Sequence, residues 1–247
     1  IPKNREKKAF GKVALTKSAG FFDNLNNLSS PVFSNVPKCM EEYGQGYGYI
    51  AYTTTLTRKY NKDILFFESL GDRAQIYVNK NLVGILYVND DKLEIPITAD
   101  KGDVLTILVE NMGRANFGPK MMRKKGIAGR CLLGENKIHF NWQVYTLPMD
   151  NLNKVVYGKE STEPSKFYKG KFNIDEPCDT FLLTDNFKKG FVTLNGFNLG
   201  RYWEVGPQKT LYVPASLLKK GENELVIFES DGIKGKAEVE FVDTPIL

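Results

Sequence analysis

The sequence has little of the material from which metal and nucleophilic sites are usually built. Its 247 residues include one histidine, His139, and three cysteines, Cys39, Cys131 and Cys178. The cysteines match neither a CxxC metal pattern nor a dense disulfide framework, so we expect buried free thiols. A metal site built from several histidines is not possible with one histidine, and a Ser-His-Asp triad could use only His139. We therefore expect no metal and no cofactor.

Long apolar runs and a strong charge imbalance are also missing. No run of roughly 18 or more apolar residues, which a membrane-spanning helix needs, occurs anywhere in the chain. The net charge of +5 is mild, and the longest basic cluster, Arg123-Lys124-Lys125, is short. Proteins that bind nucleic acids usually gather positive charge on one face. The sequence thus predicts neither a membrane nor a nucleic acid as partner.

Helical periodicity is nearly absent, and what is present favours β structure. Short runs rich in β-branched and aromatic residues are separated by Gly, Asn, Asp, Pro and Lys, a pattern typical of an all-β sandwich or barrel. Residues 104–109 carry apolar side chains on both faces of an alternating pattern, with Thr106 as the one polar residue, which predicts a central strand covered on both faces. Asn195-Gly196 is a strong signal for a two-residue hairpin turn, because both turn positions need a positive φ.

The most informative pattern is an internal repeat. Residues 76–113 and 192–230 share a run of apolar alternation, a glycine turn and a second apolar run. Asn79 precedes Gly84 by five residues, as Asn195 precedes Gly200. Such self-similarity predicts two copies of one β-sandwich rather than one large sheet system.

The repeat also suggests domain boundaries. We expect a lead-in segment at residues 1–44, a first sandwich at 45–148 and a second at 149–247. Residues 147–164 are polar and broken by proline and glycine, which is typical of a linker. The strand-like residues 12–16 of the lead-in are expected to pair with one of the sandwiches, and the sequence does not indicate which.

Acidic residues give no sign of a catalytic pair. Glycoside hydrolysis needs two carboxylates flanking the scissile bond, and spacing brings no such pair together here. Glu110 and Glu229 follow the turn glycines of the two repeats by the same eight residues, which favours a shared structural role. His139 lies in a run, residues 137–142, that we interpret as a strand, so it is expected to be an ordinary strand residue.

Aromatic side chains are plentiful enough for sugar binding, since their faces can pack on the apolar face of a pyranose. In a sandwich most such side chains fill the core instead. We expect Tyr47 and Tyr49 to share one face of a strand, in the core or at a domain contact. Trp203 follows a Gly-Arg-Tyr turn, which permits exposure to solvent without requiring it. The full set of candidates is Tyr47, Tyr49, Tyr52, Phe117, Trp142, Tyr202 and Trp203.

Four motifs carry a resemblance to a known family. They are ENMGRANFG at residues 110–118, GFNLGRYW at 196–203, GPQKTLYVP at 206–214 and FVDTP at 241–245. Over essentially its whole length the chain is similar to the C-terminal, non-catalytic region of the glycoside hydrolase family 35 β-galactosidases, which include the animal lysosomal enzyme and bacterial exo-acting relatives. The resemblance implies an all-β fold of two galactose-binding-domain-like jelly-roll sandwiches, which in the family follow a catalytic (β/α)₈ barrel.

The resemblance also implies a function. The parent enzyme would hydrolyse terminal β-galactosides with retention, using two glutamates of the barrel, so no catalytic residue is expected here and the chain alone should be inactive. Its partner would be the barrel of the same parent chain, within an enzyme that forms a homodimer. The alternative is a free-standing carbohydrate-binding module that takes galactosides. The source is expected to be bacterial, with a cytoplasmic or cell-surface location.

Within the family, the loop after the NMGR motif approaches the galactose site and carries an aromatic residue, usually tyrosine. The matching position here is Phe117, which lacks a phenolic hydrogen bond worth about 0.5–1.5 kcal/mol. Asn116 and Arg114 are the neighbouring polar candidates, although Arg114 could equally tie the loop to the sandwich. Tyr202 and Trp203 are candidates for a sugar contact or an interdomain contact.

Overall fold

A computed structural model describes residues 6–135, 137–158 and 161–247. The regular structure of these residues is nearly all β, as predicted. The described exceptions are one short helix, α1 (Phe21–Leu28), and the single 3₁₀ turns η1 (Met40–Tyr43), η2 (Leu152–Lys154) and η3 (Ala215–Leu217). The chain divides into two compact units, called here the first sandwich (Leu25–Lys154) and the second sandwich (Ile1–Asn24 with Val155–Leu247).

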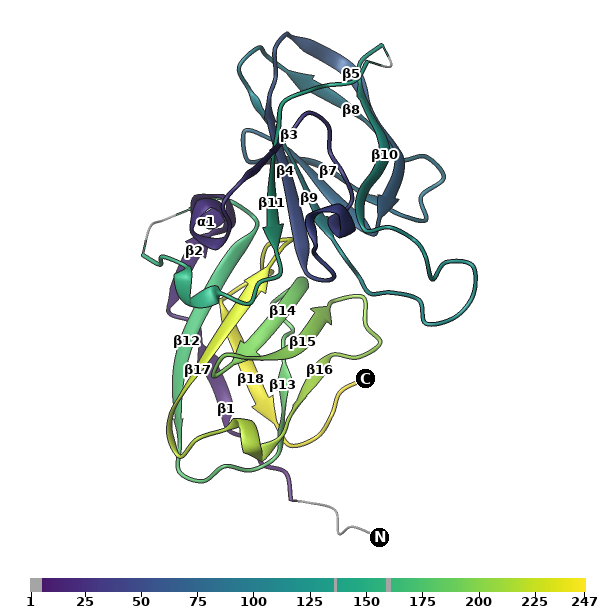
Figure 1. Ribbon diagram of the computed structural model, residues 1–247. Coiled ribbons are helices and arrows are strands. Elements are labelled where there is room, and N and C mark those ends of the chain that lie inside the picture. Colours follow the sequence, from purple (N-terminus) through teal and green to yellow (C-terminus); the bar gives the residue numbers. More distant parts are fainter. Residues whose placement is uncertain (1–5, 136, 159–160) are drawn as a thin grey trace. The chain divides into compact units, whose positions relative to one another are not determined.

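The first sandwich packs a six-stranded sheet, in the order β3-β11-β4-β9-β6-β7, on a three-stranded sheet, β10-β5-β8 (Figure 1). Every pairing within both sheets is antiparallel. The strands are β3 (Val32–Ser34), β4 (Tyr49–Thr55), β5 (Tyr60–Gly71), β6 (Arg73–Val78), β7 (Asn81–Tyr87), β8 (Glu94–Ala99), β9 (Val104–Glu110), β10 (Gly126–Leu133) and β11 (Trp142–Leu147).

The second sandwich packs a five-stranded sheet, in the order β15-β14-β17-β12-β2, on a four-stranded sheet, β1-β18-β13-β16. Its pairings are also antiparallel. The strands are β1 (Gly11–Ala14), β2 (Lys17–Gly20), β12 (Lys166–Ile174), β13 (Thr180–Leu183), β14 (Lys189–Leu194), β15 (Phe197–Trp203), β16 (Thr210–Val213), β17 (Gly221–Glu229) and β18 (Glu238–Val242).

The internal repeat of the sequence is a repeat of topology. Strands β4 to β10 and β12 to β18 occupy corresponding places in the two sheet orders. The β6–β7 and β14–β15 hairpins each carry a bulge at the same place, between Ile76 and Tyr77 and between Val192 and Thr193. The predicted central strand is also found, because β9 is paired on both sides and is buried from its second residue onward.

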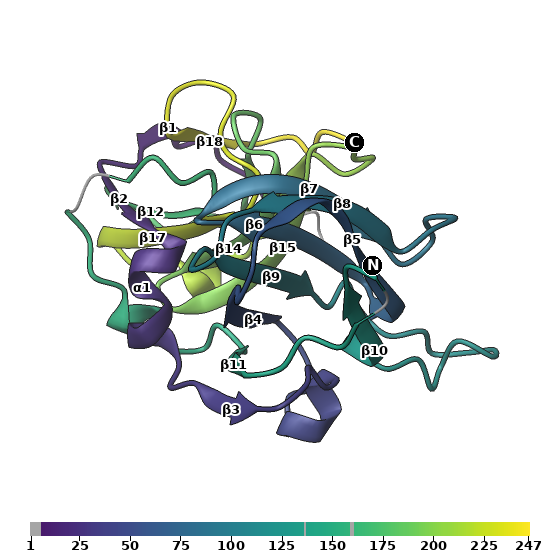
Figure 2. The ribbon, with the colours of Figure 1, turned by 90° about the horizontal axis from the view of Figure 1, so that it is seen from above.

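The lead-in segment is shared between the sandwiches rather than forming one piece. Strand β1 pairs with β18, and β2 pairs with β12 in the place that β11 takes beside β4 in the first sandwich (Figure 1 and Figure 2). The chain passes from β1 to β2 so close to Gly170 that a Cβ there would lie 2.7 Å from the carbonyl oxygen of Ala14. The first strands of the chain therefore complete the sandwich formed by its last strands.

Each sandwich has its own apolar core. In the first sandwich, alternate residues of β9, namely Leu105, Ile107 and Val109, face a core that also holds Trp142. In the second, Leu225 and Ile227 of β17 face a core to which the lead-in contributes Val13 and Leu15. This alternation of buried residues decides which polar side chains point inward at the ends of these strands.

Candidate functional site

The segment between β9 and β10 is a loop anchored at its base, and it carries three of the predicted site residues. We call residues 112–124 the Phe117 loop. Lys125, directly before β10, donates from Nζ to both carboxylate oxygens of Asp72, at 2.7 and 2.6 Å. Both side chains are nearly fully buried. A backbone amide at the other end of the loop, that of Met112, donates to the same carboxylate at 2.7 Å.

Arg114 holds the beginning of the loop against the sandwich. Its guanidinium lies 2.8 Å from a carboxylate oxygen of Glu41 and also donates to the carbonyl oxygen of Gly46. Partial burial alone would raise the pKa of Glu41, but hydrogen bonds from backbone amides and from the guanidinium outweigh it and hold the pKa below its usual value. Of the two roles considered for Arg114, the contacts favour the one that ties the loop down.

Beyond Arg114 the loop projects into solvent. Asn116 is exposed, and the Phe117 side chain is 88% exposed. Met122, further along, is 83% exposed. A soluble protein rarely leaves several large apolar side chains bare on one loop unless they meet another surface. The loop therefore combines a fixed base with a bare apolar tip.

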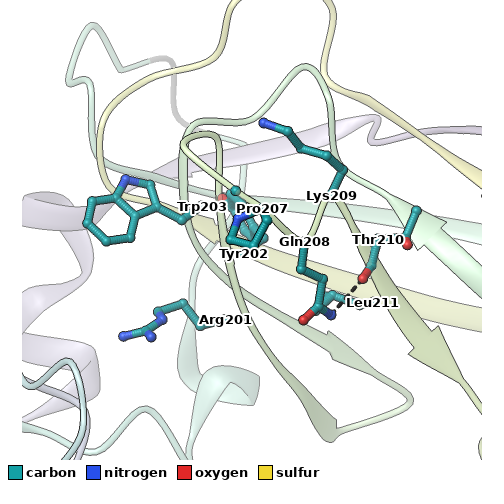
Figure 3. Close-up of a pocket in the computed structure, with 9 residues that line it drawn as sticks. Arg201, Tyr202, Trp203, Pro207, Gln208, Lys209, Thr210 and Leu211 are labelled. Carbon is teal, nitrogen blue, oxygen red and sulfur yellow. Dashed lines mark hydrogen bonds between the residues drawn. The ribbon is translucent and has the colours of Figure 1, made fainter. Parts of the chain in front are cut away.

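The second sandwich has a pocket of about 250 Å³ at the edge where its two sheets part. It lies along the end of β15, the following turn and the start of β16, which are edge strands of the five-stranded and four-stranded sheets. In Figure 3 the Trp203 and Arg201 side chains extend to one side of the pocket, while the Gln208 amide turns back to donate to the Thr210 carbonyl at 2.7 Å. The remaining lining residues are Tyr202, Gly206, Pro207, Lys209 and Leu211.

Tyr202 and Trp203 line this pocket but differ in how available they are. Tyr202 is buried, and its hydroxyl lies 2.9 Å from the carbonyl oxygen of Phe228 and 3.0 Å from the carboxylate of Glu229. Trp203 is partly exposed, and the ammonium of Lys189 lies 4.4 Å from the centre of its ring. Only Trp203 offers aromatic surface, and a cation already lies over its ring.

Glu229, to which the sequence assigned only a structural role shared with Glu110, is a buried carboxyl beside the pocket residue Tyr202. It is fully buried and accepts hydrogen bonds from the amides of Lys188 and Asp231, at 2.7 and 2.6 Å, besides its contact with Tyr202. Burial raises the pKa of Glu229 to about 7, although these hydrogen bonds oppose the rise. Glu229 therefore contacts Tyr202, which lines the pocket, without lining the pocket itself.

Glu110 and Glu229 are not equivalent, contrary to the sequence-based expectation. Val78 and Leu194 correspond, since each directly precedes the turn asparagine of its repeat. Leu105 lies opposite Val78 and Leu225 lies opposite Leu194. Counting five residues on from each leucine, the strand registers match Glu110 with Ser230. The second copy has one more residue between its turn glycine and its first core leucine (Gly221 to Leu225, against Gly102 to Leu105), and a shift of one residue exchanges the faces of a sheet. Glu229 therefore shares the inward face of Leu225 and Ile227, whereas Glu110 lies on the other face, opposite Arg73.

Two other sequence interpretations are corrected. Tyr47 is not on the strand of Tyr49, because Gly48, with a φ of 84°, precedes the start of β4. Tyr47 is exposed, and its hydroxyl donates to Asp150 at 2.5 Å. His139 is not in a strand either, since Asn141 has a φ of 67° and β11 begins only at Trp142.

The cysteines behave largely as expected. All three are free, Cys39 and Cys131 are buried, and Cys178 is only partly buried. Burial raises the pKa of Cys131 to about 12 and also raises that of Cys39. These two buried thiols therefore stay protonated near neutral pH and are poor nucleophiles.

The described residues hold no group of three or more His, Cys, Asp or Glu side chains that could bind a metal ion. The same part of the chain has no helix long and apolar enough to cross a membrane.

Comparison with known families gives one match in each sandwich. The model described as "Beta-galactosidase, first all-beta domain" matches residues 37–148. The model described as "Beta-galactosidase, galactose-binding domain" matches residues 165–223, which include the pocket.

Curated proteins similar to this chain carry related names. "Beta-galactosidase-1-like protein 2" of Homo sapiens is 36% identical over 241 residues, covering 92% of this chain and 37% of the human protein. "Beta-galactosidase 8" of Oryza sativa is 33% identical over 295 residues, covering 99% of this chain and 44% of the rice protein. The chain thus spans about two fifths of these relatives. Both relatives are eukaryotic, and they overturn the expectation of a bacterial source.

Among solved structures, a lectin from Pleurotus ostreatus in complex with GalNAc covers 96% of this chain and 80% of the lectin, at 13% identity and a TM-score of 0.26. So low a score carries no argument about this chain.

Proposed function

The chain belongs to the β-galactosidase family, of which it holds the first all-β domain and the galactose-binding domain, and on that premise we propose that it supports the catalytic barrel of an exo-acting β-galactosidase. The parent reaction would be retaining hydrolysis of terminal β-galactosides by two barrel glutamates. The lengths support this proposal, since relatives that extend well beyond the aligned part have room for a separate catalytic domain.

The observation that carries the proposal is the Phe117 loop, with its anchored base and bare tip. We propose that Phe117 packs at the rim of the galactoside site of the barrel. A large side chain that is 88% exposed gains most from burial against a partner. Lys120 and Lys124 are exposed on the same loop. Their charge would complement the acidic site of a glycosidase, where two carboxylates lie together.

Kinetics of the full-length parent enzyme test this role. Phe117→Ala removes the apolar contact and is expected to lower kcat/KM by about tenfold, which corresponds to about 1.4 kcal/mol of lost transition-state stabilisation. Phe140→Ala is the matched control, because Phe140 is an exposed phenylalanine of the same sandwich outside the loop. If Phe117→Ala left both kcat and KM unchanged, the loop would have no part in substrate recognition.

The isolated chain is expected not to hydrolyse galactosides. The lining of the pocket includes no aspartate or glutamate, whereas hydrolysis in this family needs two carboxylates. The measurement is release of nitrophenol from nitrophenyl β-galactoside, with the full-length enzyme as positive control. Turnover by the isolated chain at neutral or acidic pH would contradict the proposal.

The pocket favours a second candidate, a carbohydrate-binding module. Trp203 could offer aromatic surface to a pyranose, and Gln208 and Arg201 carry polar groups beside it. Calorimetric titration of the isolated chain with galactose and lactose separates the two candidates. Saturable binding near millimolar Kd, which corresponds to about 4 kcal/mol, would favour the module if Trp203→Ala abolished it and Phe197→Ala, an exposed aromatic on the same strand, did not. Absence of binding would favour the supporting role.

A further inference from the structure

We infer that Asp72 and Lys125 are positioning residues that clamp the two ends of the Phe117 loop and thereby fix where its tip lies. The functional part of this inference rests on the proposed role of Phe117, whereas the clamp itself can be tested on the chain alone. Neither residue is exposed enough to meet a substrate, so both would act through the loop.

The contacts of the pair join the beginning of the loop to its end. Asp72, directly before β6, accepts from the Met112 amide, while Lys125, directly before β10, donates to the carbonyl oxygen of Gly113. The Met112 N–H and the Gly113 C=O at the beginning of the loop are thus joined to its end through the Asp72–Lys125 ion pair. Each charge satisfies a backbone group of opposite polarity, so the first two residues of the loop are fixed in orientation as well as in position.

Backbone packing at the end of the loop has the same effect. A Cβ on Gly71 would lie 2.4 Å from the carbonyl oxygen of Lys124, so only glycine allows the loop end to approach this closely. The Lys125 carbonyl accepts from the Met40 amide at 2.8 Å, and the Lys125 amide donates to the Glu41 carboxylate. Close backbone packing and these hydrogen bonds therefore fix the position of the backbone around the pair.

A buried ion pair is a weak source of stability, because removing two charges from water offsets most of their attraction. Apolar side chains at both positions could pack equally well, but they could not bind a backbone N–H and a backbone C=O together. The chemistry of the pair is therefore matched to holding the loop in one geometry. The Arg114–Glu41 pair is more exposed to water and is screened more strongly, so it is the weaker of the two ties.

The first test uses this chain alone and removes both charges together, since removing one would leave the other buried and unpaired. The variant is Asp72→Leu with Lys125→Met, because neither side chain can then bind the Met112 amide or the Gly113 carbonyl. Amide hydrogen exchange in residues 112–124 is expected to become about tenfold faster, first of all at the Met112 amide that Asp72 holds, as in a segment freed for local opening, while exchange in β4 and β9 stays unchanged. The matched control is Glu68→Gln with Arg130→Met, which removes an exposed pair of the same sandwich. Unchanged exchange in residues 112–124 would overturn the clamp.

The second test uses the full-length enzyme and a double-mutant cycle with Phe117→Ala. If the clamp acts through Phe117, the charge-free pair lowers kcat/KM by about tenfold and Phe117→Ala adds little further loss, because coupled residues are not additive. A merely structural role predicts additive losses with a lower thermal midpoint, and that result would overturn the positioning role. A Lys125→Arg variant with Asp72 left in place keeps both charges, so it should retain part of the kcat/KM that the charge-free pair loses.

The two proposals fail in different ways. If Phe117→Ala alone has no kinetic effect while the charge-free pair speeds exchange in the loop, the clamp stands and the proposed function of the loop falls. If Phe117→Ala lowers kcat/KM while loop exchange in the charge-free variant is unchanged, the function stands and the clamp falls.

Discussion

Asn79 and Asn195 begin the corresponding hairpin turns of the two sandwiches in the same left-handed conformation, with φ values of 49° and 51°. The residue that follows differs, because Lys80 stands at φ 68° where the second sandwich has Gly196 at φ 84°. Only glycine adopts this conformation without a steric penalty. The first sandwich therefore holds a strained residue where the second does not.

Replacing the glycine at this turn position in the second sandwich, or introducing one in the first, should change the stability of the two sandwiches in opposite directions. Gly196→Ala is expected to destabilise the second sandwich by about 1 kcal/mol, and Lys80→Gly to stabilise the first by a smaller amount, about 0.5 kcal/mol. Urea unfolding of each variant is the measurement. Gly235→Ala is the control, since Gly235 has no positive φ and its added Cβ would make only an ordinary contact. If Gly196→Ala and Gly235→Ala changed stability by the same amount, this account would be contradicted.

A substitution in the lead-in should destabilise the sandwich at the far end of the sequence. Leu15 is buried in the second core, so Leu15→Ala is expected to cost about 2–5 kcal/mol there. Hydrogen exchange should rise in β12, β17 and β18 and stay unchanged in β4, β9 and β11. Thr16→Ala, at the exposed neighbouring position, is the control. Faster exchange confined to the first sandwich would show that the lead-in belongs to the other unit.

Much of the fold follows from local signals in the sequence. The Asn195-Gly196 turn, the central strand β9 and the all-β class each depend on patterns within about ten residues, and each is found. The tie between Arg114 and the sandwich was one of two alternatives left open by the sequence, and the contacts with Glu41 and Gly46 favour it.

The features that sequence reasoning missed depend on long-range pairing or on a single residue of register. Val13 lies opposite Val239, a partner that no pattern near residue 13 could name. The exchange of faces between Glu110 and Glu229 comes from one additional residue between Gly221 and Leu225, within β17. The clamp escaped notice because Asp72 and Lys125 are 53 residues apart and are ordinary charged residues until the fold buries them.

His139 should make the first sandwich sensitive to mild acid. Burial lowers the pKa of His139, whose Nε2 lies 3.0 Å from the hydroxyl of Thr54. The unfolded chain then binds a proton more readily than the folded one, so stability falls as the pH drops below the usual histidine pKa of about 6.5. Fluorescence of the neighbouring Trp142, in a Trp203→Phe background, reports unfolding of this sandwich. Because His139 is the sole histidine, a His139→Gln variant should lose this slope. A slope that persisted would belong to other groups.

Glu229 should give the second sandwich the opposite trend over much of the same pH range. Its pKa is raised by burial from the ordinary value of 4.5 to about 7, so the folded state keeps a proton that the unfolded state releases. The resulting stability is fully present below pH 4.5 and is lost as the pH rises to about 7, a loss of about 3 kcal/mol. Fluorescence of Trp203 in a Trp142→Phe background follows unfolding of this sandwich.

The matched variants are Glu229→Gln, which keeps the shape and cannot titrate, and Glu176→Gln, which alters an exposed carboxyl of the same sandwich. The stability of Glu229→Gln relative to the parent chain should increase steadily from pH 4.5 to 7, whereas that of Glu176→Gln should not. If the relative stability of Glu229→Gln instead decreased with pH, the amides of Lys188 and Asp231 and the Tyr202 hydroxyl would hold Glu229 ionised, and its pKa would lie below 4.5 rather than near 7.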